Sequence, residues 1–335
     1  MTQATARKRI LSGVQPSGKL HLGNYFGAIK QHIALQDEGE CFYFIADYHA
    51  LTTLPDLETE PAKRAELLRT NAHDVALSYL SLGLDPKKAI FFRQSDVPEV
   101  TELAWILSTV TGMGLLERAH SYKDKVARGI APSVGLFTYP VLMAADILIY
   151  RSNLVPVGQD QVQHLEMTRD MAGYFNRAYH EELFPLPQER LDEAAVVPGT
   201  DGKKMSKSYG NTIDIFAEGN ALKKPVMSIV TDSASVADQK DPAKCNLYAL
   251  YSLFASPDEK TEMAQRYRAG GLGYGEVKKA LLTKIDVYFA PARQRRKELE
   301  KHPSAVESIL QEGARKARAE AQKTMELVRK ATGLR

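Results

Sequence analysis

The chain has 335 residues, a length that exceeds one ordinary hydrophobic core and predicts two structural units. Its hydrophobic fraction of 44% and charged fraction of 25% are typical of soluble globular proteins. No apolar run reaches the length of a membrane span, and the N-terminus has no apolar stretch of signal-peptide length. Cys41 and Cys245 are isolated in the sequence, which argues against a disulfide framework or a zinc site and favours a reducing cytoplasm.

The net charge of +3 conceals an asymmetry along the chain. Residues 276–335 contain 15 Lys/Arg and 8 Asp/Glu, whereas the rest contains 29 Lys/Arg and 33 Asp/Glu. A basic C-terminal part on a mildly acidic body indicates a polyanionic partner. A solvated helix surface would produce the same pattern, so charge alone leaves both interpretations open.

In the first half of the chain, short apolar runs alternate with amphipathic ones. This alternation predicts an α/β fold, with a Rossmann-like parallel sheet that has helices on both faces. After about residue 215 the pattern is helical to the end, which predicts an all-helical C-terminal domain. We expect strands at 8–14, 41–46, 89–92, 154–157 and 194–197, and helices from about 23 and at 61–82, 102–110, 140–150 and 160–177.

A glycine-rich stretch at residues 13–27 follows the first predicted strand. Its glycines allow a close approach of the backbone to a ligand, and the helix start near residue 23 presents free N–H groups to an anion. His21 and Asn24 are three residues apart and can face one ligand. A plain β-to-α turn would look similar.

A second polar stretch, at residues 203–208, carries two lysines around a Met-Ser step. The charges of Lys204 and Lys207 suit a triphosphate, because they offset the negative charge that develops on leaving pyrophosphate. Most lysine clusters are exposed surface turns, so this stretch by itself is ambiguous.

Together the two stretches resemble the signatures of class I aminoacyl-tRNA synthetases. Residues 16–24 resemble the first signature, usually His-x-Gly-His, and Asn24 in place of the second His is common in the tryptophanyl branch. Residues 204–208, Lys-Met-Ser-Lys-Ser, match the second signature letter for letter. The resemblance runs from residue 12 to the helical C-terminus. It implies a catalytic, nucleotide-binding domain over 1–214, a helical anticodon-binding domain over 215–335, and a homodimer.

Asp146 is a carboxylate in an otherwise apolar predicted helix. Burial without a donor would cost several kcal/mol, so it needs either a structural partner, such as an Arg or a backbone N–H, or a donor on a ligand. The indole ring of tryptophan has one N–H and no other polar atom. A tyrosine pocket would need a second polar partner in this helix, where the chain has Ala144 and Ala145.

Residues 138–148 resemble the matching helix of tryptophanyl-tRNA synthetases. The resemblance implies that Asp146 reads the indole nitrogen and that Met143 packs against the ring. It also implies that Tyr139 and Gln161 bind the substrate ammonium. His49, in a stretch similar to the family's Asp-Gln-His-Ala, either lines this pocket or is a packed structural residue.

Residues 155–161 and 121–125 complete the resemblance. Gly158 would let the ribose approach, and Asp160 would accept from a ribose hydroxyl, although an Asp here is also a frequent helix N-cap. Family members often have Glu at the position of Gln159. Lys125 lies in a stretch similar to the family's Gln-Phe-Lys-x-Lys and would approach the phosphates. We expect Trp105 in the core or in a dimer contact.

The resemblance therefore implies three sets of residues. The catalytic set is Asn24, Lys125, Lys204 and Lys207. The ATP-binding set is Gln15, Pro16, Ser17, His21, Gly23, Asn24, Gly158, Gln159, Asp160, Val197, Lys204, Met205, Ser206, Lys207 and Ser208. The tryptophan-binding set is His49, Tyr139, Met143, Asp146 and Gln161, and no metal site is expected in the protein.

The expected activity is that of a cytoplasmic tryptophan–tRNA ligase without a membrane partner. It would activate L-tryptophan with ATP–Mg²⁺ and transfer the tryptophanyl group to tRNA(Trp), without a protein nucleophile or a tightly bound cofactor. Three alternatives remain open. They are a tyrosyl-type synthetase, a pantothenate-synthetase-like ligase, and a specialised paralogue with weak aminoacylation that acts as a binding partner.

Overall fold

A computed structural model describes residues 8–119, 122–123, 133–191 and 196–334. The chain forms two compact units. The sheet unit comprises Met1–Gly18, His32–Asp192 and Leu299–Arg335, and the helical unit comprises Lys19–Gln31 and Glu193–Glu298. The units are interleaved in sequence, whereas we expected consecutive domains over 1–214 and 215–335. That boundary remains a functional prediction and does not coincide with the compact units.

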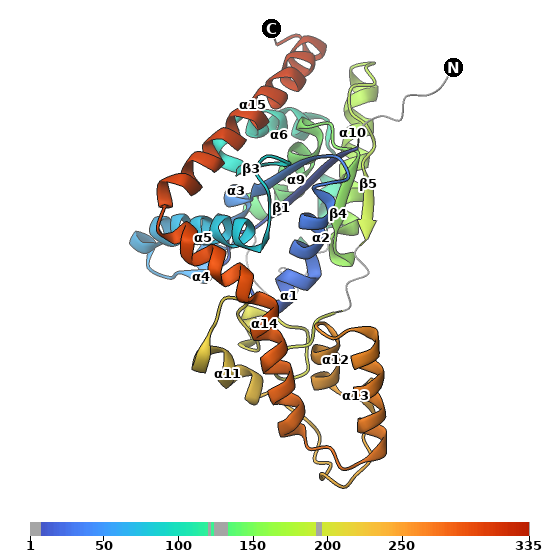
Figure 1. The fold of residues 1–335 in the computed structure, drawn as a ribbon. Coiled ribbons are helices and arrows are strands. Elements are labelled where there is room, and N and C mark those ends of the chain that lie inside the picture. Colours follow the sequence, from blue (N-terminus) through green and yellow to red (C-terminus); the bar gives the residue numbers. More distant parts are fainter. Residues whose placement is uncertain (1–7, 120–121, 124–132, 192–195, 335) are drawn as a thin grey trace, which may run out of the picture. The chain divides into compact units, whose positions relative to one another are not determined.

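The sheet unit is built on five parallel strands in the order β3-β2-β1-β4-β5 (Figure 1). Because β1 lies between β2 and β4, the strand order reverses there, and α/β sheets of this kind bind ligands at the carboxyl ends beside such a reversal. The strands are β1 Arg9–Val14, β2 Glu40–Ile45, β3 Ala89–Arg93, β4 Leu154–Val157 and β5 Gln188–Leu191.

Four of these strands match the predicted ones, but β5 was missed. Its sequence, Gln-Glu-Arg-Leu, is polar, which fits its place at the edge of the described sheet, where it pairs with β4. Such a strand lacks the apolar run from which buried strands are recognised. The strand expected at 194–197 falls partly outside the described residues.

Helices cover both faces of the sheet, as predicted. On one face, Phe42 and Phe44 of β2 belong to a core shared with α6, α9 and α10. On the other face, Tyr79 of α5 stacks on Phe91 of β3 with ring centroids 5.5 Å apart. The helices of this unit are α3 Asp47–Ala50, α4 Leu54–Leu57, α5 Pro61–Leu82, α6 Glu99–Val110, α7 Met113–Glu117, α9 Val134–Ile149, α10 Val162–Ala178 and α15 Pro303–Thr332, with 3-10 turns at Gln94–Asp96 and Gln159–Gln161.

Trp105 does not lie in the core, so the first of its two expected locations was wrong, and the dimer contact stays a prediction. Its side chain is 73% exposed. Helix α6 presents Val100, Leu103 and Leu107 to the core at helical spacing, and this spacing turns position 105 away from the sheet.

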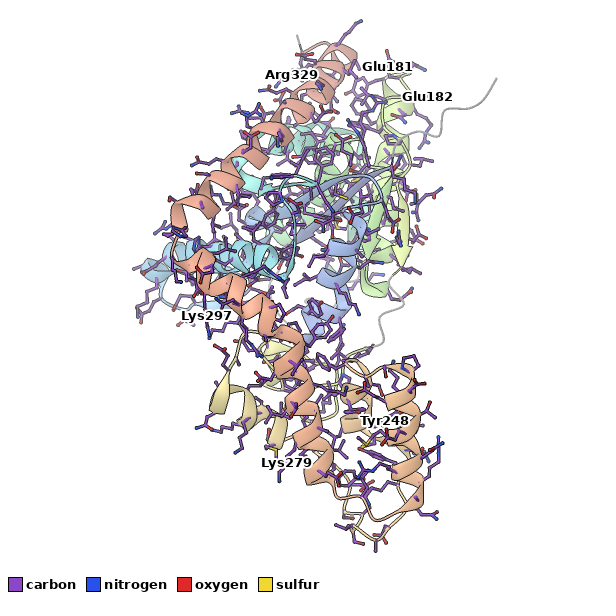
Figure 2. The ribbon with its side chains drawn as sticks, in the orientation of Figure 1. Glu181, Glu182, Tyr248, Lys279, Lys297 and Arg329 are labelled. Carbon is purple, nitrogen blue, oxygen red and sulfur yellow. The ribbon has the colours of Figure 1, made fainter. Side chains whose placement is uncertain are left out.

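The C-terminal helix α15 belongs to the sheet unit. It packs on β3 and α6, and Ala317, Ala321 and Met325 are fully buried there. Figure 2 shows Arg329 near the far end of this helix. In the described part of the chain, four ion pairs join α15 to the rest of the unit: Arg93–Glu307, Arg9–Glu320, Glu99–Arg318 and Glu102–Arg329. Arg318 and Arg329 therefore neutralise carboxylates of α6, and the C-terminal basic excess is not all available to a partner.

The helical unit carries the larger positive charge. Its two segments contain 19 Lys/Arg and 13 Asp/Glu, whereas the sheet unit contains 25 Lys/Arg and 28 Asp/Glu. Lys279 and Lys297 lie along its longest helix (Figure 2). The described helices of this unit are α1 Leu22–Asn24, the π-helix Tyr25–Ile29, α11 Gly219–Met227, α12 Asn246–Ser252, α13 Pro257–Ala269 and α14 Tyr274–Glu300, while α2 Lys30–Leu35 continues from the π-helix into the sheet unit. None of the described helices is long and apolar enough to cross a membrane.

Candidate active site

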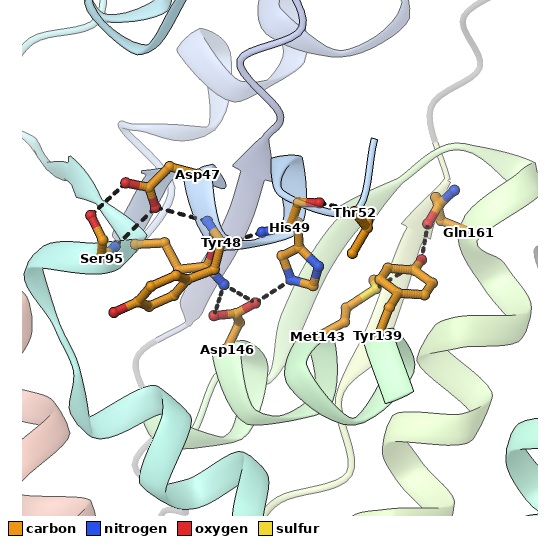
Figure 3. Close-up of polar contacts among 10 residues, drawn as sticks. Asp47, Tyr48, His49, Thr52, Ser95, Tyr139, Met143, Asp146 and Gln161 are labelled. Carbon is orange, nitrogen blue, oxygen red and sulfur yellow. Dashed lines mark hydrogen bonds and ion pairs between the residues drawn. The ribbon is translucent and has the colours of Figure 1, made fainter. Parts of the chain in front are cut away.

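Asp146 lies in the middle of α9 and is only 3% exposed. Its carboxylate receives hydrogen bonds from two side chains (Figure 3). His49 Nε2 lies 2.8 Å from Oδ2, and the Gln94 amide nitrogen lies 2.8 Å from Oδ1 and 2.9 Å from Oδ2. The donor that the sequence demanded is therefore present in the protein, although it is neither an Arg nor a backbone N–H. Burial raises the pKa of Asp146, and the hydrogen bond from His49 opposes that rise.

Gln94 was not singled out in the sequence. It begins the turn directly after β3, at the carboxyl end of a strand, and is 2% exposed. Its position after a buried strand is the one signal that was available, because ligand-binding side chains gather at such strand ends. Beside it, Ser95 donates from both N–H and hydroxyl to Asp47, the residue that begins α3.

The other residues predicted for tryptophan lie on the same helix or nearby in the sheet unit. Tyr139 and Met143 project from α9, and the Tyr139 hydroxyl lies 3.4 Å from Gln161 Oε1 and 3.8 Å from Met143 Sδ (Figure 3). The His49 ring meets the Tyr139 ring edge-on, with centroids 5.4 Å apart. The structure therefore brings together all five predicted side chains. Two of them, His49 and Asp146, are joined by a direct hydrogen bond.

Two more predicted groups follow strands of the sheet. Gln15, Pro16 and Ser17 come directly after β1, and Gly158 and Gln159 come directly after the adjacent strand β4. Gln15, Gly158 and Gln159 are exposed, whereas Pro16 is buried. These residues flank the reversal of strand order, where a nucleotide is expected. The side chain of Asp160 lies outside the described residues, as does Lys125.

Residues 19–24 of the first signature form part of the helical unit. The backbone of Leu22 donates to the carbonyl of Ile213, and the His21 N–H donates to Asn24 Oδ1 at 3.1 Å. The Gly23 N–H faces Met205 Sδ at 3.4 Å. A Cβ at position 23 would lie 2.9 Å from His21 Nδ1, so glycine is required by the close approach of this ring.

His21 is held as a neutral imidazole at physiological pH. The residue is 6% exposed, and burial, followed by the positive charge of Lys207, lowers its pKa to about 4. Within the described part of the chain, His21 Nδ1 has no hydrogen-bond partner. A neutral buried imidazole can both donate to and accept from a polar ligand, which suits the predicted contact with ATP.

The lysine loop is held in place by Asn211, a second residue that was not predicted. Asn211 is 2% exposed, and its Oδ1 accepts from Ser206 N–H at 2.8 Å. Its amide nitrogen donates to Asp201 at 2.7 Å and to the carbonyl of Lys204 at 3.1 Å. Met205 is buried, and its backbone N–H donates to the carbonyl of Val197. Lys204 and Ser208 are exposed. This arrangement anchors the loop by its backbone and leaves the Lys204 side chain accessible to a ligand.

Comparison with known proteins decides the family. The sequence model described as "tRNA synthetases class I (W and Y)" matches residues 3–290. Curated proteins named tryptophan–tRNA ligase are 55% identical in Rhodopirellula baltica, over 98% of this chain and 100% of theirs, and 54% identical in Fusobacterium nucleatum, over 98% of both. The chain belongs to the tryptophan–tRNA ligase family of class I tRNA synthetases.

Solved structures of the tryptophanyl-tRNA synthetase family agree with the fold. A structure from Campylobacter jejuni, described as complexed with ADP and tryptophan, has a TM-score of 0.88 at 51% identity and covers 97% of this chain and 99% of its own. A tyrosyl-tRNA synthetase from Archaeoglobus fulgidus has a TM-score of 0.64 at 21% identity, over 86% of this chain and 90% of its own, and shares the fold. The predicted fold class and family are thereby confirmed.

Proposed function

We propose that the chain activates L-tryptophan with ATP–Mg²⁺ and transfers the tryptophanyl group to tRNA(Trp). The observation that carries this proposal is the buried Asp146 carboxylate, which is aligned by His49 and Gln94 in the sheet unit. The helical unit adds residues 19–24 of the first signature and the lysine loop. Support also comes from the tryptophan–tRNA ligases, which match nearly the whole chain at 51–55% identity.

In the first step, a carboxylate oxygen of tryptophan attacks the α-phosphorus of ATP. The bond from this phosphorus to the bridging oxygen breaks, and pyrophosphate leaves with Mg²⁺ as part of the substrate. Lys204, Lys207 and Asn24 stabilise the charge on the phosphates, and Lys125 is proposed for the same role. No protein nucleophile takes part, so catalysis consists of positioning and electrostatic stabilisation.

In the second step, a hydroxyl of the terminal ribose of tRNA attacks the carbonyl carbon of the adenylate. The ester bond to the ribose forms, AMP leaves, and the hydroxyl proton is released. The 19 Lys/Arg of the helical unit suit an RNA partner, and we propose that the region 215–335 recognises the anticodon through unstacked bases.

Selection for tryptophan follows from how few polar groups line α9. Ala144 and Ala145 are fully buried next to Asp146, so this part of the helix offers one carboxylate acceptor between apolar neighbours. An indole N–H satisfies that acceptor and brings no further polar atom. A tyrosine hydroxyl would retain lone pairs that these alanines cannot satisfy.

We also propose a homodimer and a cytoplasmic location. The dimer is supported by Trp105 and Met113, which are 73% and 62% exposed on α6 and α7, because large apolar side chains of this kind are enriched in interfaces. Analytical ultracentrifugation of the wild type and of Trp105→Glu tests the dimer. A monomeric wild type would contradict it.

The activity is tested by ATP–pyrophosphate exchange with each of the twenty amino acids in turn. We expect exchange with tryptophan alone. Exchange with tyrosine would retain the enzyme class and overturn the role given to Asp146, and no exchange with any amino acid would indicate a paralogue that only binds tRNA or protein.

A further inference from the structure

We propose that Gln94 is a specificity-determining positioning residue, whose amide leaves Asp146 with one open acceptor position directed at the indole N–H. This inference rests on the proposed tryptophan activity. It assigns to a residue outside both signatures a role that acts through Asp146.

The orientation of the Gln94 amide is fixed by α3. Its Oε1 accepts from the backbone N–H of Tyr48 at 3.1 Å and of His49 at 3.4 Å. A rotation of the amide by half a turn would place its NH₂ group against these two donors, which is unfavourable in a site that is 2% exposed. The nitrogen of Gln94 therefore faces Asp146.

Among the residues that the structure describes, side chains occupy three of the acceptor positions of Asp146. A carboxylate has about four lone-pair positions. The Gln94 nitrogen lies 2.8 Å and 2.9 Å from the two oxygens, and His49 Nε2 lies 2.8 Å from one of them. The described residues leave one position, and it matches a ligand that brings a single donor.

The neutral amide also maintains Asp146 as an acceptor. An arginine in this place would occupy both oxygens in a bidentate pair, and an apolar side chain would leave the carboxylate short of donors. Burial raises the pKa of Asp146, and the hydrogen bonds from His49 and Gln94 both oppose that rise. A protonated Asp146 would offer a donor toward the indole N–H and lose its selectivity.

A purely structural role is the competing interpretation. Gln94 connects the end of β3 with the start of α3 and the middle of α9, so its removal would also loosen the pocket. The two interpretations differ in one respect. A loosened pocket weakens the binding of every ligand alike. A misdirected Asp146 weakens the binding of ligands that carry the indole N–H more than that of ligands that lack it.

The test compares tryptophan with benzothienylalanine, in which sulfur replaces the indole N–H. We would measure kcat/KM for both in pyrophosphate exchange and divide the value for tryptophan by the value for benzothienylalanine. Gln94→Met removes the donor and the acceptor, and Gln94→Leu removes both with a shorter, branched side chain. We expect both variants to lower the ratio by roughly tenfold or more, which is the scale of one aligned hydrogen bond to a charged group.

Ser95→Ala is the matched control. It removes the hydroxyl bond to Asp47 next to Gln94 but no contact of Asp146, so the ratio should remain that of the wild type. An unchanged ratio in the Gln94 variants, with both substrates weakened in parallel, would overturn the proposal. If Gln94→Met does not fold, Gln94→Leu decides.

The failure of the proposed function is distinguishable from the failure of this inference. If the wild type shows no exchange with tryptophan, the ligase activity is refuted. The ratio of the two dissociation constants, measured by calorimetry on the same variants, then tests Gln94 by itself.

Discussion

The close approach of α15 to β3 leads to a strong prediction at Gly313. A Cβ at this position would lie 1.9 Å from the carbonyl oxygen of Phe91 and 2.6 Å from its carbonyl carbon. Both atoms belong to the backbone of β3, so no side chain can rotate away. Gly313→Ala must therefore move α15 and β3 apart by about 1 Å or more.

The expected loss of stability follows from the contacts that α15 makes with β3. A separation of this size forfeits about a quarter to a half of each dispersion contact across the gap, and overpacking of this kind costs about 2–3 kcal/mol. At about 2–4 °C per kcal/mol for a unit of this size, we expect the melting temperature of the sheet unit to fall by about 4–12 °C. Thermal unfolding followed by circular dichroism, together with urea unfolding, measures both quantities.

Gly275→Ala in α14 is the control, and we expect it to change stability in the opposite direction, by a small gain. Its added Cβ meets nothing within 4 Å, so the variant gains only helix propensity, worth up to about 1 kcal/mol. Gly313→Ala gains the same propensity, and the difference between the two variants isolates the steric effect. A Gly313→Ala protein within about 0.5 kcal/mol of the wild type would refute the packing argument.

Three further predictions concern the site and its ionisation. Lys204→Ala should lower the rate of pyrophosphate exchange by about 10²-fold with an unchanged circular dichroism spectrum, because one phosphate-stabilising charge is lost, and an unchanged rate would remove Lys204 from catalysis. Asn211→Ala should raise KM for ATP by about tenfold and leave KM for tryptophan within about twofold, since it frees Ser206 and the carbonyl of Lys204; equal changes in both would contradict a local role. Burial lowers the pKa of both His21 and His32 to about 4 in the folded chain, below the ordinary value of 6.5, so the unfolded chain binds more protons between these values. Stability should therefore fall as pH drops from about 6.5 toward 4, and urea midpoints that stay constant between pH 7 and pH 5 would refute this.

The central strands and the helices were predictable because their signals are local. β2 and β3 are apolar runs buried on both faces, and α5 has the predicted bounds of residues 61–82. The assignment of α15 to the sheet unit was not predictable, because its buried face of small residues looks like that of any amphipathic helix. What decides its partner is the match with β3 and α6, which only the folded chain displays.

The site residues also divide into those with a local sequence signal and those whose contacts form only in the folded chain. Lys204, Lys207 and Asn24 are part of contiguous motifs that a sequence displays directly. Gln94 and Asn211 act through partners 52 and 5–10 residues away and belong to no motif, so their roles appear only when the strands and loops are in place. Asp146 was recognised as a carboxylate that needs a donor, yet the sequence left open whether that donor was in the protein or on the ligand.

The position of α15 also has a consequence for synthesis on the ribosome. β3 is an edge strand with the sequence Ala-Ile-Phe-Phe-Arg, and the helix that covers it is the last element to be translated. Until about 240 further residues have emerged, the nascent chain exposes this apolar edge, and uncovered edges of this kind pair with other chains. Chains that terminate before residue 303 would lack the cover altogether, so they should aggregate or recruit chaperones even though every residue of both signatures is present.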